Sequence, residues 1–234
     1  MTDWRIHHKA ETASTNLDAR AGHHGDVFTA DYQTAGRGRL DHKWLSPPRM
    51  NLMMSAVLSV EGLAPEQVAT LPLVVGLAVA KALSANCRLK WPNDVLAGGK
   101  KIAGILCERQ GDNVIAGIGV NVGQTEFDKE IADRATSLAK TVPAASRRVA
   151  MASVRDAVLA QVDKWYGIWR SAGFAAVYSE IAAVDFLKGR EISVRQTDDD
   201  SAPITGISNG IMPDGSLDVG GIRVYAGEAH VERI

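Results

Sequence analysis

The spacing of apolar residues changes its period along the chain and predicts both strands and helices. Apolar and β-compatible residues favour strands at 4–10, 27–33, 51–60, 88–90, 101–109 and 113–122. Apolar residues at three- and four-residue steps predict helices within 65–85, beginning near Pro72, and over 146–183. This order of strands and helices favours an α+β fold.

The pattern changes near the C-terminal end, after Leu187. Short alternating strands are predicted at 191–196, 204–207, 216–219, 222–226 and 228–233, with turns at 198–200, 213–215 and 220–221. This segment of about 45 residues is too small to be comfortably stable alone, so we expect it to pack on the larger part. We therefore divide the chain into a larger domain, residues 1–187, and a small all-β barrel or sandwich, residues 188–234.

Composition and charge restrict the functional class and the compartment. Among the 234 residues, 26 basic and 27 acidic side chains give a net charge of −1, without the strongly basic footprint of a nucleic-acid binder. Cys87 and Cys107 are isolated and typical of a reducing compartment. The N-terminus has no signal pattern, and the longest apolar run, 71–80, is too short for a bilayer. We expect a cytoplasmic protein with neither nucleic-acid nor membrane partners.

A glycine- and arginine-rich stretch, Gly36 to Trp44, is the first candidate for chemistry. Two arginines alternate with two glycines, and a lysine and a tryptophan follow. Glycine lets backbone N–H groups approach a ligand closely, and arginine matches carboxylate and phosphate oxygens. Tryptophan offers a flat face for a heterocycle. The stretch indicates a loop that closes over an anionic, partly aromatic ligand; the alternative is a solvated basic turn.

A second candidate is the run Lys90-Trp91-Pro92-Asn93-Asp94, followed seven residues later by Lys101. Pro92 stiffens a turn, and the glycine pair at 98–99 predicts a hairpin that brings the two lysines and the aspartate together. Such a group suits a polyphosphate with Mg²⁺, because the charges stabilise oxygens in an in-line displacement. The alternative is a surface hairpin with a weak salt bridge.

Other common sites do not fit the sequence. The histidine pairs at 7–8 and 23–24 lack further ligands at metal spacing, so we predict no protein metal site and a solvated or structural role for these histidines. No serine or cysteine lies on a glycine-rich elbow. Residues 98–101 lack a Walker-type pattern, and 117–123 miss the dinucleotide fingerprint by one residue.

Five motifs, in order over residues 11–124, together resemble the biotin protein ligase family. They are Ser14-Thr15-Asn16 with Tyr32-Gln33, GRGR with its Lys-Trp-x-Ser-Pro continuation to Pro47, KWPND at 90–94, K-x-A-G-I-L from Lys101, and G-x-G-x-N ending at Asn121. The resemblance implies a mixed-sheet catalytic domain like that of class II aminoacyl-tRNA synthetases, and a small C-terminal Src-homology-3-like β-barrel. It also implies the short class without an N-terminal helix-turn-helix, hence no repressor activity.

The resemblance implies a two-step reaction with ATP, Mg²⁺ and biotin. Biotinyl-5′-AMP forms first, and biotin then passes to a lysine of a biotin carboxyl carrier domain of a carboxylase. The implied biotin site comprises Ser14, Thr15, Asn16, Gln33, Arg37, Gly38, Arg39 and Lys101. The implied ATP site comprises Arg37, Arg39, Trp44, Lys90, Asn93 and Asn121, and the catalytic residues would be Arg39, Lys90, Asp94 and Lys101.

These implied roles agree with the chemistry of the side chains. The uncharged ureido ring of biotin needs neutral donors and acceptors, and three consecutive small polar residues at 14–16 exceed what one helix cap needs. Arg39 would hold the α-phosphate, Lys90 the nucleotide phosphates and Lys101 the developing charge at the acyl carbon. Asp94 would engage the acceptor lysine, or magnesium.

Two alternatives remain at this point. A lipoate or octanoate ligase or transferase of the same broad fold would not need the polar cluster, and a silent biotin-binding protein would not need Arg39 or Lys101. The residues 40–42 replace a further Gly-Arg that many relatives carry, which removes one positive charge from the loop. A homodimer through sheet edges is a further expectation.

Overall fold

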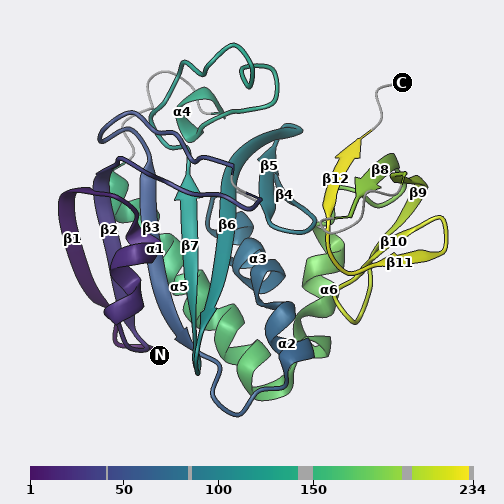
Figure 1. Ribbon diagram of the computed structural model, residues 1–234, viewed down its shortest axis with the longest axis horizontal. Helices are drawn as coiled ribbons and strands as arrows, with labels where there is room; N and C mark the ends of the chain where they lie inside the picture. The colour runs from purple at the N-terminus through teal and green to yellow at the C-terminus, as the bar shows by residue number, and fades with distance from the viewer. Residues whose placement is uncertain (41, 84–85, 142–149, 197–201, 232–234) are drawn as a thin grey trace.

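A seven-stranded mixed sheet is the centre of the molecule (Figure 1). The computed structural model describes the chain except residues 41, 84–85, 142–149, 197–201 and 232–234. The strand order is β1-β2-β3-β7-β6-β5-β4, with β1 and β2 parallel and the other neighbours antiparallel. The strands are β1 (Arg5–Thr12), β2 (Asp26–Gln33), β3 (Leu52–Ser59), β4 (Cys87–Lys90), β5 (Asp94–Ala97), β6 (Lys100–Gln110) and β7 (Asn113–Val120).

Helices cover one face of this sheet. α3 (Leu71–Leu83) and α5 (Met151–Ala172) lie behind it in Figure 1 and bury their apolar sides in the main core cluster. The other helices are α1 (Thr15–Asp18), η1 (Ala19–Ala21), α2 (Pro65–Ala69), α4 (Leu138–Thr141) and α6 (Ala175–Ala183). The predicted α+β class and the mixed sheet are thus confirmed.

The helix predicted to begin near Pro72 is confirmed as α3, which begins at Leu71, and Pro72 lies in its first turn, where a missing N–H is tolerated. The short helix α2 precedes it and ends at Ala69. The prediction of one continuous helix over 146–183 was wrong: α5 ends before Gly173, whose φ of +77° suits glycine, and the chain resumes a helix as α6.

Residues Pro65–Leu83 together are long and apolar enough for a membrane span by length and composition. However, 61% of that stretch is buried inside the structure, where α3 packs against α5 and the sheet. Its apolar character is therefore explained by the core.

Two strands differ from the prediction. β5 was missed because Val95 and Leu96 are both buried, which removes the polar–apolar alternation; the register between β5 and β6 also shifts at this point. β9 (Ile204–Ile211) extends beyond the predicted 204–207 through a polar, glycine-containing run, because it pairs with a neighbour on each side.

The C-terminal strands form a separate five-stranded antiparallel sheet, ordered β11-β10-β9-β8-β12. The remaining strands are β8 (Glu191–Arg195), β10 (Leu217–Val219), β11 (Ile222–Val224) and β12 (Glu228–Val231). Its buried residues, such as Ile192 and Val219, belong to the same core cluster as the large sheet. The expectation that this part packs on the larger one is therefore confirmed.

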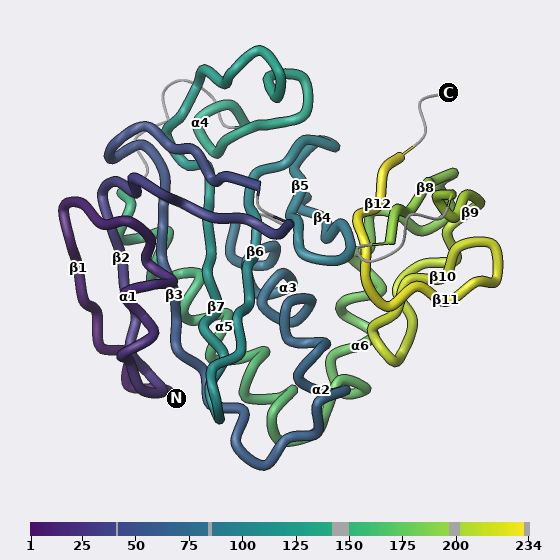
Figure 2. The backbone as a smooth tube through the Cα atoms, in the orientation of Figure 1, coloured from purple at the N-terminus to yellow at the C-terminus, as the bar shows by residue number. Residues whose placement is uncertain are grey.

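The segment between β2 and β3 crosses the face of the large sheet opposite the helices (Figure 2). It contains the arginine-rich stretch, whose Asp41 lies outside the described residues. Also outside them are the predicted helix start at 146, the turn at 198–200 and the strand end at 232–233. The crossing brings Arg37 to Glu108 of β6, and Arg39 to Gly227, just before β12.

Candidate active site

The arginine loop, residues 36–48, is held in a narrow hairpin-like shape by its backbone. Arg37 and Lys43 form an isolated antiparallel bridge, and Trp44 N donates to Gly36 O at 3.0 Å. A Cβ at Gly36 would lie only 2.5 Å from Trp44 O, so glycine is needed where the two arms meet.

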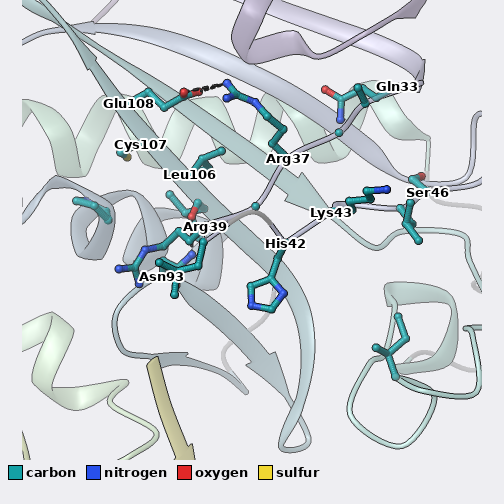
Figure 3. A pocket seen from close by; sticks show the side chains of 18 of the residues that line it. Gln33, Arg37, Arg39, His42, Lys43, Ser46, Asn93, Leu106, Cys107 and Glu108 are labelled. Atoms are coloured by element: carbon teal, nitrogen blue, oxygen red, sulfur yellow. Dashed lines mark hydrogen bonds and ion pairs between the residues drawn. The ribbon is translucent and has the colours of Figure 1, made fainter. Parts of the chain in front are cut away.

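Beneath and beside this loop is a cavity of about 1060 Å³ (Figure 3). Five of the predicted site residues line it: Gln33, Arg37, Gly38, Arg39 and Asn93. Leu106, Cys107 and Glu108 of β6 form another part of its wall. The volume is that of an ordinary small-molecule site.

A buried polar cluster adjoins the cavity at the start of α1. Ser14, Thr15 and Asn16 are each less than 5% exposed. Ser14 occupies the N-cap position without a side-chain cap hydrogen bond, so capping does not account for its hydroxyl. Gln33 Oε1 accepts from Thr15 N at 2.7 Å and from Thr15 Oγ1 at 3.1 Å. The predicted biotin-site polar residues are thus brought together.

Ser55 completes this cluster and was missed by the sequence analysis. Its Oγ lies 2.6 Å from Asn16 Oδ1 and 2.7 Å from Thr15 Oγ1. Gly117 of β7 leaves the space for Asn16, because a Cβ there would overlap the Asn16 amide. A serine in the middle of an otherwise apolar strand was the signal available in the sequence.

The two arginines of the loop point to different partners (Figure 3). Arg37 Nη2 donates to both carboxylate oxygens of Glu108 at 2.8 and 3.0 Å. Arg39 Nη1 donates to the carbonyl of Gly227, just before β12, at 3.2 Å. Burial lowers the pKa of Arg39, opposed by the charges of Glu228 and Asp94.

The predicted lysine–aspartate–lysine group also comes together. Lys90 and Asp94 are paired across β4 and β5, and Lys101 Nζ lies 2.6 Å from Asp94 Oδ1. Burial lowers the pKa of Lys90; Lys101 adds to this effect, whereas Asp94 and Glu228 oppose it. A partly buried concentration of positive charge like this attracts phosphate or carboxylate oxygens.

Trp44 lies flat on the sheet rather than open in the loop. A Cβ at Gly119 would fall within 2.5–2.9 Å of its ring, and one at Gly104 within 3.2 Å. Lys101 Nζ is 5.9 Å from the ring centroid. The indole Nε1 is buried without a hydrogen-bond partner among the described residues. The two glycines therefore leave the room that the indole ring needs to lie against the sheet.

The two predicted asparagines hold backbone in this region. Asn93 Nδ2 donates to Ile105 O at 2.7 Å, and Asn121 Nδ2 to Thr136 O at 3.0 Å. Asn93 lines the cavity, whereas Asn121 is almost completely buried. Asn93 thus holds the turn before β5 against β6, and Asn121 holds the end of β7 against the backbone at Thr136.

This arrangement combines a neutral hydrogen-bonding pocket with a cationic region. The first suits an uncharged polar ring, and the second suits a carboxylate next to phosphate groups. Within the described ranges, no three His, Cys, Asp or Glu side chains gather into a group that could hold a metal. The arrangement favours an acyl-phosphate chemistry in which arginine and lysine stabilise negative charge.

Comparison with known proteins points the same way. Residues 5–124 match the model of the Biotin/lipoate A/B protein ligase family. The chain is 34% identical to the biotin–(acetyl-CoA-carboxylase) ligase of Mycobacterium tuberculosis, over 94% of this chain and 86% of that protein. The ligase of the same name from Paracoccus denitrificans is 32% identical, with coverages of 89% and 91%.

A solved structure extends the similarity to almost the whole chain. Biotin protein ligase from Aquifex aeolicus, in complex with biotin and ATP, superposes with a TM-score of 0.84 at 30% identity. The match covers 98% of this chain and 99% of that one. The similarity therefore includes the C-terminal sheet.

Proposed function

Because this chain belongs to the Biotin/lipoate A/B protein ligase family, we propose that it is an ATP-dependent biotin–protein ligase. It activates biotin as biotinyl-5′-AMP and transfers it to a lysine of a biotin carboxyl carrier protein. The observation that carries the proposal is the neutral polar cluster that the buried Thr15 and Asn16 form with Gln33 beside the arginine loop.

Biotin binds with its ureido ring at the polar cluster. Ser14, Thr15, Asn16 and Gln33 supply neutral donors and acceptors, which a buried uncharged ring requires. The carboxylate tail then lies toward Arg39 and Lys101, which supply positive charge. Arg37, already paired with Glu108, belongs to the wall of the ring pocket.

In the first step, a carboxylate oxygen of biotin attacks the α-phosphorus of ATP and pyrophosphate leaves. Lys90 neutralises the phosphates, Arg39 holds the α-phosphate, and Lys101 stabilises charge at the acyl group. The aromatic ring of Trp44, 5.9 Å from Lys101 Nζ, provides a face for adenine. Asn93 and Asn121 hold the backbone at Ile105 and Thr136.

Mg²⁺ neutralises nucleotide phosphates when it is bound. Such an ion is commonly held by phosphate oxygens, water and one or two carboxylates, so a large protein ligand cluster is not needed. Asp94, whose Oδ1 lies 2.6 Å from Lys101 Nζ, is the carboxylate of the cationic group that would hold Mg²⁺.

In the second step, the acceptor lysine loses its proton and attacks the acyl carbon, an amide bond forms and AMP leaves. We assign Asp94 to the approach of that amine, because a carboxylate attracts the ammonium form and accepts a hydrogen bond. The Gly36–Pro48 loop shields the mixed anhydride from water during the interval.

Several finer features are part of the same proposal. The C-terminal sheet closes as a Src-homology-3-like barrel, and the domain boundary lies between residues 187 and 188.

The protein works in the cytoplasm, consistent with two cysteines that are not disulfide-bonded. The exposed edge strand β1 offers unpaired backbone for a homodimer, which sedimentation velocity tests against a monomer.

The family also includes lipoate ligases, so the assay must discriminate the two acids. A biotin-carrier domain is incubated with the protein, MgATP and equal concentrations of biotin and lipoate, and its intact mass is measured. A single biotinyl increment is expected. A lipoyl increment would assign the chain to the other branch, and absence of both increments together with absence of pyrophosphate release would refute ligase activity.

A further inference from the structure

Glu108 occupies the junction between the polar cluster and the arginine loop. It lies on β6 opposite Ile115 of β7, its side chain is 27% exposed, and it lines the cavity. None of the sequence motifs includes it. Figure 3 shows its carboxylate directed at Arg37 across the cavity wall.

One side of the Glu108 carboxylate fixes the amide of Asn16. Oε2 accepts a hydrogen bond from Asn16 Nδ2, which also donates to Leu106 O at 3.4 Å. The Asn16 oxygen lies on the opposite side, 2.6 Å from Ser55 Oγ. With acceptors on one side and a donor on the other, the amide has a single favoured orientation.

The same carboxylate anchors the loop through Arg37. The guanidinium donates to both oxygens, and Arg20 Nη2 stands 3.9 Å from Oε1. A charge-assisted hydrogen bond of this kind is stronger than a neutral one. Of the two acids that line the cavity, Glu108 is therefore the one whose side chain bonds both the polar cluster and the loop within the described part of the chain.

We infer that Glu108 is a positioning residue for biotin: it orients the Asn16 amide and anchors Arg37, and so couples the ring pocket to the arginine loop. The inference rests on the proposed function, because biotin is the ligand whose pocket it shapes. Glu108 acts through Asn16 and Arg37 rather than on the reacting atoms.

The negative charge of Glu108 does not by itself weaken the binding of the uncharged ureido ring. A carboxylate in a partly buried pocket is costly unless it is paired, and here Arg37 and Arg20 compensate it. Replacing it by glutamine keeps an acceptor for Asn16 but leaves Arg37 without its counter-ion. Replacing it by alanine removes both interactions.

The test measures the biotin dissociation constant by calorimetry and the steady-state constants by pyrophosphate release. Glu108→Gln should weaken biotin binding about tenfold, and Glu108→Ala more strongly, since hydrogen bonds to a charged group disappear. KM for biotin should rise while kcat stays within about twofold, because Arg39, Lys90 and Lys101 are untouched. Glu108→Asp should recover part of the affinity.

Two further variants make the result specific. Glu126→Gln removes an exposed carboxylate from residues 124–134 and should leave biotin binding unchanged. The double variant Glu108→Gln/Arg37→Gln should bind biotin no more weakly than whichever single variant has the lower biotin affinity, since both changes break the same ion pair.

Wild-type affinity in Glu108→Gln and Glu108→Ala would overturn the inference. So would a fall in kcat and melting temperature parallel to the affinity loss in all three Glu108 variants, which is the signature of a merely structural role. Failure of the wild-type protein to bind biotin would overturn the proposed function itself, and the two failures are therefore distinguishable.

Discussion

Gly117→Ala should damage the biotin pocket although the backbone at this position accepts alanine. Gly117 lies within β7, outside the left-handed region, so the substitution introduces no backbone strain. The new Cβ would overlap the Asn16 side chain, which must leave its place between Ser55, Leu106 and Glu108. Alanine at 117 therefore tests the geometry of Asn16 without replacing that residue.

The expected cost follows from the hydrogen bonds that the displaced Asn16 amide no longer makes. Three hydrogen bonds at about 1 kcal/mol each give about 3 kcal/mol. Alanine also lowers the conformational entropy of the unfolded chain, which offsets roughly 0.5–1 kcal/mol of this loss. The unfolding free energy should therefore fall by about 2 kcal/mol. For a chain of this size the melting temperature should then fall by about 4–8 °C. Biotin affinity should fall at least tenfold, since the misplaced amide enters the ring pocket.

Thermal unfolding and calorimetric titration with biotin measure both effects. Gly167→Ala is the matched control: Gly167 lies in α5, is exposed, and has nothing within 4 Å of an added Cβ, so stability should rise by up to about 1 kcal/mol. In an Asn16→Ala background, Gly117→Ala should cost far less. An equal cost in both backgrounds would refute the reasoning.

Three other predictions concern the cationic group, the arginine loop and the sheet edge. Lys101→Ala should abolish pyrophosphate release with a small change in melting temperature, since its ion pair with Asp94 is half exposed; unchanged release would remove it from the mechanism. Arg39→Gly should let biotinyl-5′-AMP escape and label bystander lysines, which mass spectrometry of an added inert protein detects; labelling as selective as that of the parent would contradict this. Asp26 has its pKa lowered by the His23 backbone N–H, by His7 and by Arg5, so its contribution to stability is present above about pH 4 and is lost as pH falls further. Asp26→Asn should therefore be less stable than the parent near neutral pH, and the difference should shrink in acid; a constant difference in urea unfolding from pH 7 to 3 would argue against it.

Local patterns were sufficient for most of the fold. Strands such as 113–122 and 51–60 carry long apolar runs, and their packing against helices follows from ordinary burial. The sequence did not reveal β5, because its central residues Val95 and Leu96 are both buried and therefore do not alternate, or the break at Gly173, because apolar spacing continues across it. Periodicity detects buried faces, but not the places where the backbone changes direction.

The candidate site was predictable where residues of the right type are adjacent in sequence. Lys90, Asp94 and Lys101 meet because two consecutive hairpins, β4–β5 and β5–β6, carry them. The roles of Ser55 and Glu108 were not predictable, since each depends on a hydrogen bond with Asn16, which is 39 and 92 residues away in the sequence. The opposite directions of the two loop arginines also depend on partners far along the chain.

The hydrogen bond between Arg39 and the Gly227 carbonyl has a consequence for protein synthesis. The two residues are 188 positions apart, so a growing chain must extend that far beyond Arg39 before this anchor of the loop exists. Domains form from the N-terminal side during translation. The biotin pocket can therefore assemble on the ribosome while the loop still lacks its C-terminal anchor, and competence to retain a reactive adenylate arrives late, with the last sheet. The protein therefore becomes able to retain the adenylate only after its C-terminal sheet has been synthesised.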